Sequence, residues 1–275
     1  MSKEKNWTGE RLETFVTGET MTEHLHRYAI AMDLVKGKDV LDIACGEGYG
    51  ANLLAQHAAH VTGVDIDTLT VEKAKKKYPL KNIIFKQGSV SNIPGNDNFF
   101  DIVISFETLE HTAEHDKFIS EVKRVLKPDG LFIISTPDKS TYSDNAAYKN
   151  PFHKKELYEN EFKELIQKYF LFTGFYKQSS FPGSIFLRET DPKIERIYSG
   201  NYNRITKDIL PVALYHIAFA SAKELPLIPS SMFQNDQTLN QILEEQQSAL
   251  KQTVTYKTGN VILAPFKFMR SLFKK

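Results

Sequence analysis

The chain has 275 residues, and its 35 lysines and arginines nearly balance its 34 acidic residues, for a formal net charge of +1. This balance excludes a general electrostatic reason to expect a nucleic-acid partner. A single cysteine, Cys45, excludes an internal disulfide and a cysteine-rich metal site. The first residues lack the apolar core of a signal peptide, and no run of residues is apolar enough for a membrane span, so we expect a cytoplasmic protein.

The first predicted element is a helix over residues 20–35. Its apolar residues recur at helical spacing, and Thr20 or Thr22 can cap its start. We expect residues 1–36 to form a helical lid over a ligand site, with Tyr28 in contact with the ligand that this site binds.

Residues 39–51, DVLDIACGEGYGA, predict a buried strand, a tight turn and the start of a helix. Glycines in the turn let a ligand approach the backbone, and the helix start presents free N–H groups. The spacing fits NAD as well as other adenosine cofactors. Asp42 at the end of the strand favours S-adenosylmethionine, because its sulfonium and ammonium are positive whereas a pyrophosphate would be repelled.

Three further strands with polar ends follow in β/α alternation. Residues 60–67 predict a strand that ends on Asp65, placed to bind both hydroxyls of a ribose, with Asp67 as the nearby alternative. Residues 83–94 predict a third strand and a loop, and residues 99–111 predict a fourth strand. Ligands of open α/β sheets lie beyond the carboxyl ends of the strands, where these side chains emerge.

Together, residues 38–137 resemble class I S-adenosylmethionine-dependent methyltransferases, with a methyltransferase domain of the type 11/25 kind. The leader GERLETF…EHLHRY is similar to that of bacterial methyltransferases of surface-polysaccharide synthesis. The resemblance implies S-adenosylmethionine as the cofactor, held by residues of the four motifs: Asp42, Ala44, Gly46, Gly48, Gly50, Asp65, Ile66, Ser89, Val90, Phe106 and Glu107.

The alternation predicts an α/β fold: a Rossmann-like, seven-stranded, mostly parallel sheet with an antiparallel last strand, plus a helical C-terminal extension. The sixth strand is expected at 171–180. The last strand is either 183–189 or, preferably, 212–221, because the second run is longer and more apolar. The methyltransferase domain then covers residues 37–225, with an insertion on the substrate side at about 180–210.

The polar, aromatic stretch after the fifth strand is expected to bind the methyl acceptor. Aromatic rings with polar tips suit a sugar, so Tyr142, Tyr148 and Phe152 join Tyr28 as expected acceptor contacts. His111 and His153 are the candidate general bases, since histidine titrates near neutral pH. The scattered set Asp138, Asp144 and His153 offered no readable metal site, so none is assigned.

Residues 226–275 are expected to form the helical, amphipathic extension. Leucines between 239 and 250 predict a helix that can pair with another helix in a homodimer. The basic, amphipathic end APFKFMRSLFKK suits peripheral contact with the inner face of a membrane, contact with a protein partner, or packing on the domain.

The sequence thus predicts an S-adenosylmethionine-dependent O-methyltransferase that acts on a sugar or phosphosugar of a bacterial surface glycan or its precursor. Methylation of a small, quinone-like metabolite is one alternative. A non-catalytic, cofactor-binding scaffold module in glycan assembly is another, and an NAD oxidoreductase is a remote third.

Overall fold

The computed structural model describes residues 11–16, 18–147, 149–181, 183–188, 197–201, 204–208, 212–234, 247–253, 255–256 and 258. The chain divides into two compact units, Met1–Gln234 and Asn235–Lys275. The first unit contains the sheet and the cavity described below. In the second, residues 247–252 are helical. The basic end predicted to contact a membrane or a partner lies outside the described residues.

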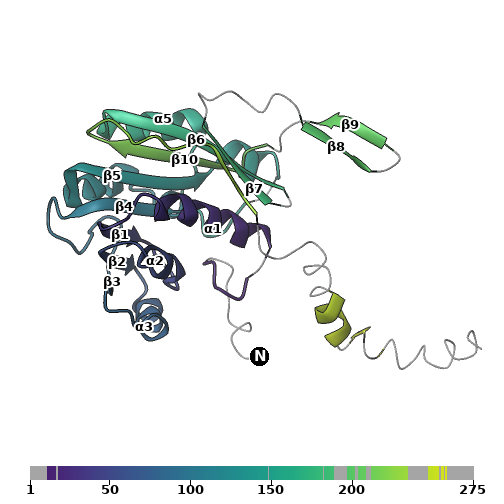
Figure 1. The fold of residues 1–275 in the computed structure, drawn as a ribbon, viewed down its shortest axis with the longest axis horizontal. Coiled ribbons are helices and arrows are strands. Elements are labelled where there is room, and N and C mark those ends of the chain that lie inside the picture. The colour runs from purple at the N-terminus through teal and green to yellow at the C-terminus, as the bar shows by residue number, and fades with distance from the viewer. Residues whose placement is uncertain are drawn as a thin grey trace, which may run out of the picture. The chain divides into compact units, whose positions relative to one another are not determined.

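A nine-stranded sheet forms the centre of the first unit, in the order β11-β7-β6-β10-β5-β4-β1-β2-β3. Figure 1 shows most of these strands stacked in this order above β3. The strands from β1 to β5 run parallel, whereas β10 is antiparallel to both of its neighbours, β5 and β6. Their bounds are β1 Asp39–Ile43, β2 His60–Asp65, β3 Ile83–Gln87, β4 Phe100–Phe106, β5 Leu126–Pro137, β6 Phe172–Phe181, β7 Gly183–Arg188, β10 Tyr215–Ser221 and β11 Ser231–Phe233.

The predicted strand count of seven is wrong, and the sheet has nine strands. Both segments that competed for the place of the last strand are strands. The favoured segment is β10, antiparallel as predicted, while the other, β7, folds back antiparallel on β6, where Phe181 pairs with Gly183. The short strand β11 then pairs with β7.

The helical C-terminal extension predicted from residue 226 is also not matched, because residues 231–233 are a strand of the main sheet. Within the expected substrate-side insertion, β8 (Ile197–Asn201) and β9 (Arg204–Asp208) form a separate two-stranded antiparallel sheet.

In the described part of the chain, five helices cover the two faces of the main sheet, and each face has its own core. The alternation of a buried strand sends Val40 to one face and Leu41 and Ile43 to the other. The face of Val40 packs against α1, α2 and α3, and the opposite face against α4 and α5. The helices are α1 Glu19–Met32, α2 Tyr49–Leu54, α3 Thr68–Lys77, α4 His115–Val125 and α5 Glu159–Tyr169, which confirms the predicted β/α alternation.

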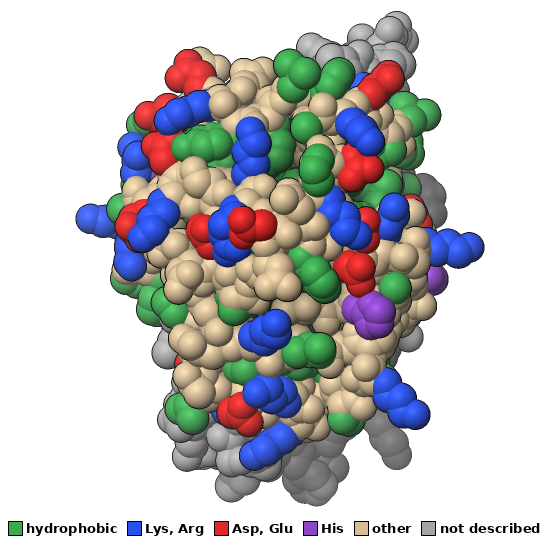
Figure 2. Space-filling model, turned by 90° about the vertical axis from the view of Figure 1, so that its left-hand side faces the viewer, with side chains coloured by type: hydrophobic (Ala, Val, Ile, Leu, Met, Phe, Trp, Pro, Cys, Tyr) green, Lys and Arg blue, Asp and Glu red, His purple; other side chains and the backbone are tan. Residues whose placement is uncertain are grey.

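The described surface is mixed in charge. Figure 2 shows one face on which cationic and anionic side chains are interspersed instead of gathered by sign. None of the helices that the structure describes combines the length and the apolar character needed to span a bilayer.

Candidate functional site

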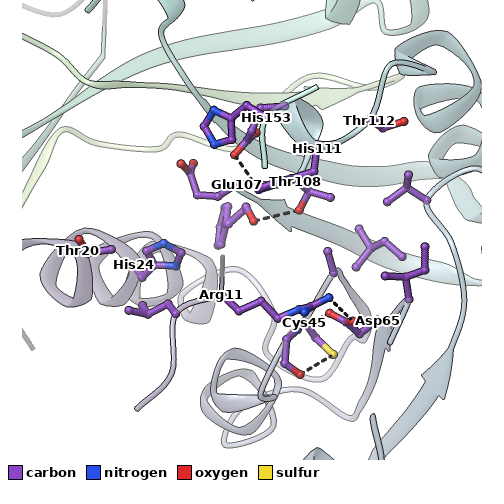
Figure 3. Close-up of a pocket in the computed structure, with 18 of the residues that line it drawn as sticks. Arg11, Thr20, His24, Cys45, Asp65, Glu107, Thr108, His111, Thr112 and His153 are labelled. Carbon is purple, nitrogen blue, oxygen red and sulfur yellow. Dashed lines mark hydrogen bonds and ion pairs between the residues drawn. The ribbon is translucent and has the colours of Figure 1, made fainter. Parts of the chain in front are cut away.

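A cavity of about 460 Å³ opens at the carboxyl ends of the parallel strands. This volume lies in the range of small-molecule sites, and the position is the one at which open α/β sheets bind ligands. The turns after β1, β2, β3 and β4 line the cavity, together with α1, the segment 11–16, and residues that follow β5. Figure 3 shows Arg11 and Asp65 on one side of the space and His111 and His153 on the other.

The turn after β1 takes left-handed backbone conformations at Ala44 (φ 61°), Gly46 (φ 53°) and Gly48 (φ 88°). Ala44 and Gly46 line the cavity, as expected. Gly48 and Gly50 instead lie behind its wall, where they make room for aromatic rings. A Cβ atom on Gly48 would lie 2.8 Å from the Phe85 ring, and one on Gly50 would lie 2.0 Å from Cζ of Tyr28.

Asp42 is buried at the end of β1, beneath the cavity, and does not itself line it. The Tyr28 hydroxyl donates to its carboxylate, with distances of 3.2 Å to Oδ1 and 3.3 Å to Oδ2. Burial raises the pKa of Asp42 to about 7, and the nearby Asp65 adds to this rise while the Tyr28 hydrogen bond opposes it. The carboxyl group therefore changes charge near neutral pH.

We expect this carboxyl group to make stability fall as the pH rises. Between its ordinary pKa of 3.8 and its folded pKa of about 7, the folded chain holds a proton that the unfolded chain has lost. As the pH rises from about 4 to about 7, the free energy of unfolding therefore falls by about 4 kcal/mol, and it falls no further above about pH 7. Urea unfolding of the unmodified protein and of Asp42→Asn at a series of pH values measures it. Parallel curves for the two proteins would contradict the expectation.

Asp65 ends β2 with its carboxylate at the cavity and 3% of the residue exposed. The Gly46 N–H donates to Oδ2 at 3.0 Å, and the Asp67 N–H donates to Oδ1 at 2.9 Å. Arg11 Nη2 lies 3.4 Å from Oδ1. Figure 3 marks this ion pair with a dashed line. These contacts fix the carboxylate beside the glycine turn, the position expected of a group that binds a ribose.

Asp67, the alternative ribose ligand, has a different place. Its carboxylate caps α3 by accepting from the N–H groups of Leu69 at 2.7 Å and Thr70 at 3.3 Å, and the residue does not line the cavity. The structure thus places the Asp65 carboxylate at the cavity and the Asp67 carboxylate at the start of α3.

An apolar strip continues the cavity wall beyond Asp65. It is formed by Ile66 and Val90, with Ser89 beside Val90 in the chain, and Phe106 lines the cavity next to Tyr28. Ile66 is 63% exposed just after the end of β2. A flat, apolar ligand group such as a purine would cover it.

Two glutamates follow β4, of which Glu110 is buried and Glu107 is partly buried. Glu107 adopts a positive φ of 51°, and its Oε1 accepts from Ser135 Oγ at 2.6 Å and lies 3.8 Å from Arg27 Nη1. Burial raises the pKa of Glu107, and the buried Arg27 guanidinium opposes the rise. Burial, followed by the charge of Glu107, raises the pKa of Glu110 well above its usual value.

The two predicted bases meet at the cavity. The rings of His111 and His153 lie 5.1 Å apart, nearly perpendicular, and both line the space. His111 Nδ1 donates to the Phe152 carbonyl oxygen at 3.1 Å, and His153 Nδ1 forms a short hydrogen bond with Glu156. Because each Nδ1 faces an acceptor oxygen, the neutral tautomer carries its lone pair on Nε2.

Of the four predicted acceptor contacts, the structure describes three, and two of these line the cavity. Tyr28 and Tyr142 line the cavity, and Tyr142 stacks on His153 with ring centroids 5.4 Å apart. Phe152 does not line it and contributes its carbonyl to His111. Tyr148 lies outside the described residues.

Several lining residues escaped the sequence analysis, among them Arg11, Tyr49, Thr108 and Tyr215. Tyr215 begins β10, so the apolar run that predicts this strand also brings a ring to the site. Arg11 comes from a segment without regular structure. Thr14 anchors this segment by donating its N–H to Glu47 Oε2 at 2.8 Å, and Glu47 also pairs closely with Lys77.

Comparison with known proteins identifies the central part of the chain. Residues 41–134 match a family described as a methyltransferase domain. A probable S-adenosylmethionine-dependent methyltransferase of Mycolicibacterium smegmatis is 41% identical over 132 residues, which are 48% of this chain and 51% of that protein. The phthiotriol/phenolphthiotriol dimycocerosates methyltransferase of Mycobacterium tuberculosis is 38% identical over 109 residues, or 39% and 40% of the two chains.

The chain spans about half the length of the first of these curated relatives and less of the second. Among solved structures, the YcgJ protein from Bacillus subtilis superposes with a TM-score of 0.52 at 19% identity, covering 73% of this chain and 100% of that one. A Thermotoga maritima protein described as a SAM-dependent methyltransferase, possible histamine N-methyltransferase, gives 0.54 at 17% identity, covering 74% and 91%. At these identities the likeness shows the fold.

Residues 41–134 therefore match a methyltransferase domain, and such a domain implies S-adenosylmethionine as the cofactor. The cavity fits this cofactor. The Asp65 carboxylate would accept from the ribose hydroxyls, the strip with Ile66 would cover the adenine, and the open turn at Ala44 and Gly46 would receive the methionine part. When bound, the cofactor supplies an electrophilic methyl group.

Proposed function

We propose that this chain, which carries a methyltransferase domain over residues 41–134, methylates a hydroxyl group of a sugar or phosphosugar in a bacterial surface glycan or its precursor. Methyl transfer from a sulfonium is an in-line displacement, so the protein must hold the hydroxyl in line and take its proton. The observation that carries the proposal is His153, which lines the cavity and is paired with the largely buried carboxylate of Glu156. His153 lies on the side of the cavity opposite Asp65 (Figure 3).

His153 and Glu156 form this pair. The side chains are 7% and 10% exposed, and the carboxylate holds the imidazole at Nδ1. His153 Nε2 is then the atom that takes a proton from the acceptor hydroxyl, and Glu156 stabilises the imidazolium that forms. His111, the second predicted base, donates through Nδ1 to a neutral carbonyl, which stabilises a positive charge less well.

The charges at the cavity favour a neutral sugar over a phosphosugar. Among the described residues that line the cavity, Arg11 is the single lysine or arginine, and it lies beside Asp65. A phosphate on the acceptor would meet Glu107 and Glu110 without a cation of its own. The ring of Tyr142 and the side chain of Asn150, linked by a 3.5 Å hydrogen bond, suit the apolar face and hydroxylated rim of a sugar.

Incubation of the purified chain with methyl-labelled S-adenosylmethionine and glycan-precursor extracts tests the proposal. We expect label in a sugar-containing product whose mass rises by one methyl group. Label in a lipid fraction alone would overturn the sugar acceptor in favour of one like that in the name of the M. tuberculosis relative. Cofactor binding without transfer to any fraction would favour the scaffold alternative.

His153→Gln is expected to lower kcat by about 10²–10⁴-fold, the usual contribution of a general base. Glu156→Gln is expected to lower kcat less, because the imidazole keeps its lone pair while the imidazolium loses its counter-charge. His60→Gln is the matched control, since this exposed histidine also binds a carboxylate, that of Asp39 at 2.8 Å. A kcat of His153→Gln equal to that of the control would remove the base assignment.

A further inference from the structure

We propose that Glu110, His111 and His153 form a binding site for a divalent transition-metal ion. One ligand atom of each residue lies within 4.8 Å of the others. Two imidazoles and one carboxylate are a ligand set typical of zinc, manganese and iron(II), and they leave further coordination positions open. The inference concerns ion binding alone and does not depend on the proposed methyl transfer.

Both histidines are oriented as metal ligands usually are. A ligating imidazole donates its other ring N–H to a carbonyl or carboxylate oxygen, which fixes the tautomer and the ring plane. His111 does so to the Phe152 carbonyl at 3.1 Å, and His153 does so to the Glu156 carboxylate. Nε2 is thus the ligand atom of each ring.

The carboxylate of Glu110 is held in a similar way. Its Oε2 accepts from Thr136 Oγ1 at 3.0 Å, while Oε1 lies 3.9 Å from His111 Nε2. The residue is 1% exposed, and a buried carboxylate requires a compensating charge or proton. A bound cation between Oε1 and the two imidazoles provides that charge.

The ligands come from two segments that the backbone ties together. The short 3-10 turn η2 (Leu109–His111) carries two of them, and the Glu110 carbonyl accepts from the N–H groups of Lys154 at 2.8 Å and Lys155 at 3.1 Å. His153 is therefore anchored next to the turn before any ion binds. Metal–nitrogen bonds of about 2.1 Å place two ligands at most about 4.2 Å apart, so binding would draw the side chains slightly together.

Nitrogen ligands favour transition metals over magnesium or calcium, which prefer oxygen. A bound ion and general-base action would use the same atom of His153. The base assignment of His153 therefore applies to the metal-free protein, in which Nε2 keeps its lone pair.

Titration of the full chain, stripped with a chelator, with Zn²⁺ and with Co²⁺ tests the site without cofactor or acceptor. We expect one equivalent of Zn²⁺ by calorimetry, and visible Co²⁺ absorption that Zn²⁺ abolishes. His111→Gln, His153→Gln and Glu110→Gln should each weaken Zn²⁺ binding by about 100-fold or more. Glu156→Gln, which removes only the partner of a ligand, should weaken it by about 10–100-fold.

His60→Gln is again the control and should leave Zn²⁺ affinity unchanged. Far-UV circular dichroism of each variant shows whether it is folded, and the Co²⁺ spectrum of the unmodified protein decides the matter if a variant is not. Absence of a stoichiometric site, or equal Zn²⁺ affinity in His153→Gln and His60→Gln, would overturn the proposal. Because no cofactor is used, failure of methyl transfer and failure of metal binding remain distinct results.

Discussion

Asp65→Ala is expected to weaken S-adenosylmethionine binding by about 10²–10⁴-fold. Two hydrogen bonds from a ribose diol to a charged acceptor contribute about 1.5–3 kcal/mol each, and the substitution removes both. It also leaves the N–H groups of Gly46 and Asp67 without the oxygen that now accepts from them at 3.0 Å and 2.9 Å. Calorimetric titration of the cofactor into each protein measures the loss.

Asp67→Ala is the matched control for this measurement. It removes a carboxylate two positions away that caps α3 but does not line the cavity. The variant should lose about 0.5–2 kcal/mol of stability through the lost cap and keep its cofactor affinity within about threefold. Equal losses of affinity in the two variants would mean that Asp65 does not hold the ribose.

Gly50→Ala is expected to destabilise the fold by about 3 kcal/mol, although Ala is the better helix former. The added Cβ would lie 2.0 Å from Cζ and 2.2 Å from the hydroxyl oxygen of Tyr28. Tyr28 is 5% exposed and packs edge-on against Phe106 and Tyr49, so its ring has little room to retreat. The urea midpoint measures the effect, and an unchanged m-value attributes it to stability.

A double-mutant cycle isolates the steric cause. In a Tyr28→Ala background the ring is absent, and Gly50→Ala should then change stability by less than about 1 kcal/mol. A cost of the same size in both backgrounds would place the strain in the backbone of α2 instead of in the contact with Tyr28.

The central strands could be predicted because the residues of each strand and of the turn after it are sufficient to indicate the strand. Buried parallel strands read as apolar runs, and β1, β2 and β4 each end on a polar or glycine-rich turn that also forms the site. Their order along the chain sufficed to bring Asp65 and Glu107 to one cavity. The sequence indicates β7 only as an alternative last strand and does not indicate β11, because β11 has three residues and its Ser231 pairs with Phe186 from a distant segment.

The buried polar groups around α1 were harder to recognise. In the sequence, Glu23, His26 and Arg27 read equally well as a solvated helix face. They are buried because they face polar groups on the strands: Gln178 Oε1 accepts from Arg27 at 2.8 Å, and Ser184 Oγ lies 3.0 Å from His26 Nδ1. Hydrophobic periodicity cannot predict a polar interface of this kind, because it follows the positions of apolar residues only.

The acids considered for a metal at the sequence level also have other partners. Asp138 accepts from the Ser140 N–H at 3.1 Å and lies 3.4 Å from His216 Nε2, and Asp144 accepts from the Tyr158 hydroxyl at 2.9 Å. Glu110, which lies by His111 and His153, was not among the candidate site residues of the sequence analysis. Its place beside His153 depends on backbone hydrogen bonds between distant segments, which no local pattern contains.

The backbone hydrogen bonds from Lys154 and Lys155 to Glu110 tie η2 to the stretch that follows β5, so the cavity wall has two parts. One is built from the turns after β1 to β3, and the other from η2 and the clamped stretch that follows β5. We expect that a stretch grafted from a homologue, if it keeps the two N–H groups that bond Glu110, would alter the part of the cavity near His153 and leave the turns after β1 to β3 unchanged.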